Sequence, residues 1–157
     1  MNFSFTQENL DKIEKVLAKY PDKQSAVMPV LYIAQEQNGY VSIEVTREVA
    51  RVLEMDETDV LGVATFYSMY HENEPGKYHI QVCTSVSCML HGGNDIFNAV
   101  KAKLGVKRGG TTPDKKFSLE EVECMGSCGT SPMMVINEDY YENLTPEKAL
   151  QIIESLK

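Results

Sequence analysis

The sequence has few basic residues and no long apolar run. Its 157 residues include 15 lysines and arginines against 23 acidic residues, which gives a formal net charge of -8. Binding to nucleic acid or to an anionic membrane requires a basic surface, so we expect neither kind of partner. No apolar stretch approaches the roughly 18 residues of a membrane helix, and the start MNFSFTQENLDK lacks the basic and apolar parts of a signal peptide. We therefore expect a cytoplasmic protein without direct membrane contact.

The sequence also lacks internal repeats and low-complexity segments, and its composition is that of an ordinary globular protein. The acidity is uneven along the chain. Residues 1–75 hold 13 acidic and 6 basic residues, whereas residues 76–157 hold 10 and 9. The acidic N-terminal half is more consistent with a protein partner than with nucleic acid.

The N-terminal half places apolar residues at helical spacing in four segments. We predict helices over about 6–20, 22–39 and 42–55 and a short one beginning at 56. Each follows a residue that can cap a helix: Thr6, Asp22, Ser42 and Asp56. Pro29 should kink the second helix unless it lies in the first turn or two. Residues 1–75 are therefore predicted to form a small helical bundle.

The pattern changes after Glu74-Pro75-Gly76, where we place a domain boundary. Residues 77–83 alternate apolar and polar side chains, as a half-buried strand does. A helix at 95–104, strands near 117–124, 133–137 and 140–143, and a final helix behind Thr145 and Pro146 follow. This βαβ then ββα order is typical of thioredoxin-like domains. The predicted fold class is α+β, a helical bundle followed by a thioredoxin-like domain at 76–157.

The only four cysteines form two close pairs, Cys83 with Cys88 in CTSVSC and Cys124 with Cys128 in CMGSC. Each pair ends a predicted strand, and neighbouring parallel strands would bring the two loops together. Disulfides are the first alternative, but they are typical of an oxidising compartment and of chains whose core is too small. This chain is expected to be cytoplasmic and to have a sufficient core. Structural zinc usually takes pairs separated by two residues, whereas here the intervals are four and three. An iron-sulfur cluster is the third alternative and the one that the wider intervals favour.

Ligand number and type distinguish the kinds of cluster. Two cysteine pairs, each on one iron, suit a 2Fe-2S cluster, whereas a Rieske centre would replace one pair by two histidines. His91 has no histidine partner and is interpreted as a polar loop or helix-entry residue, while His71 and His79 lie outside both cysteine loops. The small loop residues either let backbone N–H groups approach the sulfurs or form ordinary turns: Thr84, Ser85, Ser87, Gly126, Ser127 and Gly129.

Besides the two cysteine motifs and the 35 residues between them, the sequence contains two characteristic stretches, AVMPVLYIAQEQNGYVS and VLGVATFYSMY. With them the chain resembles, nearly end to end, the E-subunit family of NADH-quinone oxidoreductases. That family includes the small subunits of NAD-linked iron hydrogenases and formate dehydrogenases. The resemblance implies a ferredoxin domain with one 2Fe-2S cluster held by Cys83, Cys88, Cys124 and Cys128. The segment Gly129-Thr130-Ser131-Pro132 departs from the more apolar residues of respiratory members.

The resemblance also implies a larger partner subunit that binds FMN and NADH and that the helical segment contacts. The expected function is electron transfer within an iron hydrogenase, an NADH-quinone oxidoreductase or a formate dehydrogenase, with no catalytic residue in this chain. A freestanding 2Fe-2S ferredoxin and a zinc-stapled thioredoxin-like interaction module are the alternatives. The aromatic run Phe66-Tyr67-Ser68-Met69-Tyr70 is interpreted as a partner surface or as the filling of a seam between the two domains.

Overall fold

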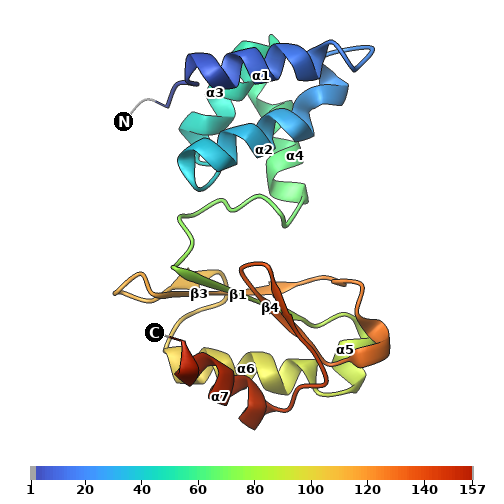
Figure 1. Cartoon of the computed structure of the whole chain (residues 1–157), viewed down its shortest axis with the longest axis vertical. Coiled ribbons are helices and arrows are strands. Elements are labelled where there is room, and N and C mark those ends of the chain that lie inside the picture. Colours follow the sequence, from blue (N-terminus) through green and yellow to red (C-terminus); the bar gives the residue numbers. More distant parts are fainter. Residues whose placement is uncertain (1–2, 157) are drawn as a thin grey trace. The chain divides into compact units, whose positions relative to one another are not determined.

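The computed structural model describes residues 3–156 and consists of two compact units (Figure 1). One unit ends at Glu74 and the other begins at Pro75. The first unit is helical and the second combines helices with a five-stranded sheet. The predicted α+β class is therefore confirmed. Among the residues described, no helix is long and apolar enough to cross a membrane.

The helical unit contains the four predicted helices. They are α1 (Gln7–Leu17), α2 (Val27–Asn38), α3 (Ile43–Leu53) and α4 (Glu57–Phe66). Side chains of Thr6, Ser42 and Asp56 accept hydrogen bonds from the first turns of α1, α3 and α4. Asp22 instead accepts from the backbone of Ser25, at the 3-10 turn Gln24–Ala26 that precedes α2. Pro29 is the third residue of α2, where no intrahelical donor is required.

Apolar side chains from all four helices form the core of this unit. Among the members with no more than 1% exposed surface are Ile13, Leu31, Val45, Leu53 and Val60. Tyr70 also belongs to this core, and its hydroxyl donates to the Met28 carbonyl at 2.9 Å. Phe66, in contrast, is 78% exposed. The aromatic run at 66–70 is thus divided between the interior and the surface of the helical unit.

The second unit is built on a sheet with strand order β2-β3-β1-β4-β5. The strands are β1 (Tyr78–Cys83), β2 (Gly110–Thr111), β3 (Phe117–Val122), β4 (Met134–Ile136) and β5 (Asp139–Tyr141). The helices are α5 (Val86–Leu90), α6 (Gly93–Leu104) and α7 (Pro146–Ser155), and Figure 1 shows α6 and α7 on the same face of the sheet. β1 and β3 are parallel, and the other neighbours are antiparallel.

In the helical unit, α2 begins at Val27, behind the 3-10 turn Gln24–Ala26, rather than near residue 22. Four local features of the second unit also differ from the sequence-based expectation. α5 and β2 were not predicted, because five and two residues are too few to show a helical or strand period. α6 begins at Gly93, earlier than expected, and β3 ends at Val122, so Cys124 lies beyond the strand rather than at its end. These four differences all fall beside the cysteine loops or at the edge strand.

The buried hydroxyl of Tyr70 gives a test of the helical core. We expect Tyr70→Phe to lower the free energy of unfolding by about 1 kcal/mol at neutral pH, because the Met28 carbonyl loses its buried donor. Burial raises the pKa of Tyr70 from 10.0 to about 12, with smaller contributions from Tyr32 and Tyr67. The folded chain then keeps a proton that the unfolded chain loses, so stability falls as pH rises from 10 to about 12.

The Tyr70→Phe variant should lack this part of the alkaline loss, as urea unfolding across that pH range would measure. Tyr20→Phe, at an exposed tyrosine, is the control and should keep the wild-type alkaline loss. An alkaline loss in Tyr70→Phe as large as that of the wild type would contradict the assignment.

Candidate metal centre

Parallel pairing of β1 and β3 brings the two cysteine loops to one edge of the sheet. Cys83 is the last residue of β1 and lies opposite Val122, the last residue of β3. Cys88 lies in α5, Cys124 comes two residues after β3, and Cys128 begins the 3-10 helix Cys128–Thr130. Because both strands end at the same level, the loops that follow them start side by side.

One cysteine pair is buried and the other is exposed. Cys83 and Cys88 are each 2% exposed and pack against Met133 and Val135. Cys124 and Cys128 are exposed, and their Sγ atoms lie 3.5 Å apart. Two thiolates on one tetrahedral ion with bonds of about 2.3 Å are separated by about 3.8 Å. The exposed pair therefore fits a shared metal ion with little movement.

Electrostatic contacts join the two pairs into one group of four thiols. Burial, together with contact with Cys83 and the charge of Cys128, raises the pKa of Cys88 to about 11. The backbone N–H of Gly126, which donates to Cys124 Sγ at 3.4 Å, lowers the pKa of Cys124. The hydrogen bond with Cys124 raises the pKa of Cys128. Such mutual repulsion between thiolates favours a bound cation that neutralises them.

Gly93 and Gly126 occupy positions in the site that require glycine. The sequence patterns alone did not show this requirement. A Cβ atom on Gly93 would lie 2.7 Å from the Cys83 carbonyl oxygen and 2.9 Å from that of Cys88, so α6 can begin there only with glycine. Gly126 has a φ of 81°, which favours glycine and directs its N–H at Cys124. The paired glycines just after CTSVSCMLH were the available signal for Gly93.

The small polar residues of the loops bind carboxylates as well as forming turns. The hydrogen bonds run from Thr84 to Glu121 at 2.7 Å, from Ser85 to Glu123 at 3.0 Å, and from Ser127 and Thr130 to Glu142. The Ser127 and Thr130 hydroxyls lower the pKa of Glu142, which therefore stays ionised. Among the small residues expected to bring an N–H to sulfur, Gly126 does so. Of these carboxylates, Glu123 adds negative charge near Cys124, whereas Glu121 also pairs with Arg108 at 3.2 Å.

The histidines are engaged in hydrogen bonds. His91 follows the last residue of α5, and its Nδ1 lies 2.7 Å from the Ser87 carbonyl oxygen. His79 lies within β1 and contacts Ser118 and Glu120 through its two ring nitrogens. His71 lies in the helical unit, outside the cysteine loops.

Residues 13–157 match the family of thioredoxin-like 2Fe-2S ferredoxins. The chain belongs to this family. The E subunit of NADH-quinone oxidoreductase from Rickettsia felis is 47% identical over 98% of this chain and 93% of its own length. The mitochondrial NADH dehydrogenase (ubiquinone) flavoprotein 2 of Dictyostelium discoideum is 45% identical over 99% of this chain and 64% of its own length. The resemblance to the E-subunit family and the 2Fe-2S cluster as cofactor are confirmed.

The fold is also similar to part of an NAD+-reducing NiFe-hydrogenase. Its crystal structure in the H2-reduced state superposes with a TM-score of 0.64 over 79% of this chain and 21% of that chain. Sequence identity is 18%, so this likeness concerns the fold alone. This chain therefore corresponds in fold to about a fifth of that hydrogenase chain.

The tight approach at Gly93 can be tested without a cofactor. We expect Gly93→Ala to lower the free energy of unfolding of the metal-free chain by about 1–3 kcal/mol, because its methyl group would overlap the carbonyls of Cys83 and Cys88. Urea unfolding monitored by circular dichroism measures the change. Gly129→Ala is the matched control, since a Cβ there meets nothing within 4 Å. Equal stability of the Gly93→Ala and wild-type chains would contradict the clash.

Proposed function

We propose that this chain is an electron-transfer subunit that holds one 2Fe-2S cluster with Cys83, Cys88, Cys124 and Cys128. The observation that carries this proposal is the convergence of two cysteine pairs on adjoining loops, within a family of 2Fe-2S ferredoxins. When bound, the cluster supplies one-electron transfer between ferric and ferrous iron. The chain itself supplies the thiolates, the covering side chains and the surrounding charge.

The burial of the thiols gives the site a closed side and an open side. Cys83 and Cys88 are covered by the strand residues Met133 and Val135, whereas Cys124 and Cys128 face solvent. An electron partner would therefore approach the loop that carries Cys124 and Cys128. The carboxylates around the two loops oppose the addition of a negative charge, which favours a low reduction potential.

The proposed electron partner is the flavin- and NADH-binding subunit of an NADH-linked oxidoreductase complex. The Rickettsia and Dictyostelium relatives are named as parts of NADH-quinone oxidoreductase and NADH dehydrogenase, and they match nearly this entire chain. Residues 76–157 would carry the cluster and residues 1–75 would dock on the partner. The complete complex would end in a quinone-reducing module, an iron hydrogenase or a formate dehydrogenase. A cytoplasmic location, with the membrane reached only through partners, belongs to the same proposal.

Exposure makes Cys124 and Cys128 the sharper tests of the ligand assignment. Their replacement by alanine should leave the metal-free fold unchanged, because neither thiol is part of the packed core. We expect Cys124→Ala and Cys128→Ala to lose the visible absorption and the paramagnetic signal of the reduced cluster after anaerobic reconstitution with iron and sulfide. Met125→Leu, beside Cys124, is the control and should retain both signals. A full cluster spectrum in Cys124→Ala would exclude Cys124 as a ligand.

The exposed face of α4 supports docking by the helical unit. Gly62 lies inside α4, and a Cβ there would meet nothing within 4 Å. A glycine in a helix costs about 1 kcal/mol relative to alanine, yet none of the residues that the structure describes lies close enough to Gly62 to require it. Phe66, one turn further along the helix, is 78% exposed. An exposed glycine that no packing contact requires, next to an exposed aromatic ring, is consistent with close approach by another protein.

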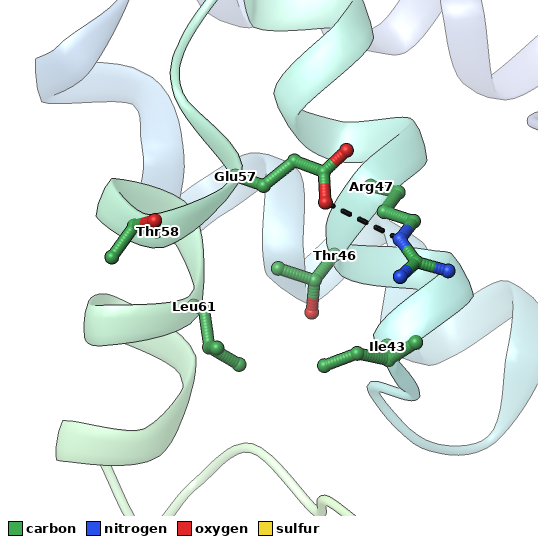
Figure 2. A pocket seen from close by; sticks show the side chains of 6 residues that line it. All are labelled: Ile43, Thr46, Arg47, Glu57, Thr58 and Leu61. Carbon is green, nitrogen blue, oxygen red and sulfur yellow. Dashed lines mark hydrogen bonds and ion pairs between the residues drawn. The ribbon is translucent and has the colours of Figure 1, made fainter.

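A cleft lies between α3 and α4, and one of its lining residues, Leu61, is next to Gly62 in sequence (Figure 2). Ile43 and Leu61 point toward each other across it, Thr46 lies between the two helices, and Arg47 pairs with Glu57 at 3.2 Å at its edge. Residues 60–70 carry no charge, although the N-terminal half is strongly acidic. The face is thus suited to an apolar segment whose basic flanks would meet the surrounding acids.

Substitutions at Gly62 should change stability and docking in opposite directions. We expect Gly62→Ala to raise the free energy of unfolding by about 1 kcal/mol, and Gly62→Leu to leave it no lower, because the site is open. Gly62→Leu should nevertheless reduce recovery of a flavin subunit in anaerobic affinity purification from the native cells. Partners would be identified by mass, and the eluate would be assayed for NADH oxidation.

Asn98→Leu, exposed on α6, is the control for the added side chain. Undiminished recovery with Gly62→Leu would exclude this face as the docking surface. Recovery of the wild-type chain alone would instead support a freestanding ferredoxin.

A further inference from the structure

Three side chains outside the cysteine set connect the two cysteine loops. Ser87 lies between Cys83 and Cys88, and its hydroxyl donates to the Cys128 carbonyl at 3.2 Å. The same hydroxyl lies 3.2 Å from Ser131 Oγ, and Ser131 Oγ lies 3.1 Å from His91 Nδ1. Each of these contacts joins residues about 40 positions apart in sequence.

The donors of these contacts can be assigned from the acceptors. His91 Nδ1 lies 2.7 Å from the Ser87 carbonyl, which only accepts, so Nδ1 carries the proton. Ser87 has one hydroxyl proton and donates it to the Cys128 carbonyl, which leaves Ser131 as the donor between the two hydroxyls. His91 has one Nδ1 proton and shares it between the Ser87 carbonyl at 2.7 Å and, as the longer branch, Ser131 Oγ at 3.1 Å. The hydrogen bonds run in one direction, from His91 through Ser131 and Ser87 to the carbonyl of Cys128.

Because all these hydrogen bonds point the same way, the three side chains together polarise the peptide group of Cys128. Hydrogen bonds in a chain polarise one another, so the Cys128 peptide experiences more positive potential than a single serine would provide. The contacts also hold the loop of Cys128 against the loop of Cys83 and Cys88. Cys83 is already fixed by the sheet, because its N–H donates to the Met133 carbonyl at 3.4 Å. Cys128 has no strand to hold it, since it begins a short 3-10 helix.

We propose that Ser87, Ser131 and His91 are positioning residues that hold Cys128 at the separation from Cys83 and Cys88 that the cluster requires. The proposal rests on the ligand assignment proposed above. It assigns the three residues an effect on the reduction potential and on the retention of the cluster. Removing the Ser131 hydroxyl breaks the chain in its middle and leaves each cysteine in place.

The test compares Ser131→Ala with Ser131→Thr, which keeps a hydroxyl, in the anaerobically reconstituted full chain. We expect Ser131→Ala to lower the reduction potential, because the Ser87 hydroxyl that donates to the Cys128 carbonyl is no longer polarised by a hydrogen bond from Ser131. We also expect an iron chelator to remove the cluster about fivefold faster, the factor of one ordinary hydrogen bond. Ser131→Thr should restore both properties toward wild type. Urea unfolding of the metal-free chains should be the same for all three.

Ser155→Ala is the matched control, because the Ser155 hydroxyl donates to the Ile152 carbonyl at the end of α7, in a different part of the unit. A Ser131→Ala chain with wild-type potential, reduced-state spectrum and chelator sensitivity would overturn the positioning role. A Ser131→Ala chain that unfolds more easily without metal would show a general structural role instead. Failure of the ligand assignment is recognised separately, by retention of the cluster in Cys128→Ala.

Discussion

Parallel pairing between β1 and β3 is the constraint on which the site depends. The register sets Cys83 opposite Val122, so the chain leaves the sheet at one edge in both strands. The connection between them must then return to the opposite edge, and α6 makes that crossing on the face of the sheet. Because α6 begins directly on the carbonyls of Cys83 and Cys88, its first residue is glycine. The parallel strand pairing therefore determines where α6 crosses the sheet, and the start of α6 in turn requires glycine at position 93.

Within that arrangement, the surroundings of the thiols divide into an apolar side and a polar side. Met133 and Val135 cover the buried pair, so Cys83 and Cys88 are held by packing. The exposed loop has no such cover and is held by hydrogen bonds to Glu142 and to the first cysteine loop. Packing tolerates little displacement, whereas hydrogen bonds between surface loops can adjust. The chain therefore combines a rigid pair of thiols with a pair whose position depends on a few polar contacts.

Features that depend on neighbouring residues could be predicted from the sequence. Features that depend on contacts between residues far apart in the chain could not. Thr6, Ser42 and Asp56 cap helices through hydrogen bonds within four residues, so the sequence around them contains the whole interaction. The alternation in β1 likewise reports burial on one face. Tyr70, in contrast, belongs to the core of the helical unit and donates to the Met28 carbonyl of α2, and no local sequence pattern distinguishes it from exposed Phe66. The link between Ser87 and Ser131 depends on the sheet register and is invisible to any local pattern.

The two units differ in a way that bears on whether the chain works alone. The second unit is nearly balanced in charge, whereas the helical unit is strongly acidic and has an uncharged stretch in which Phe66 and Met69 are exposed. A diffusing carrier needs only a small, transient contact near its cluster. In such a carrier, the exposed apolar surface of the helical unit would have no binding function. A permanent subunit covers such a surface against its partner. In the proposed docking role, the helix stability lost at the open glycine Gly62 would be offset by a partner chain packed against α4.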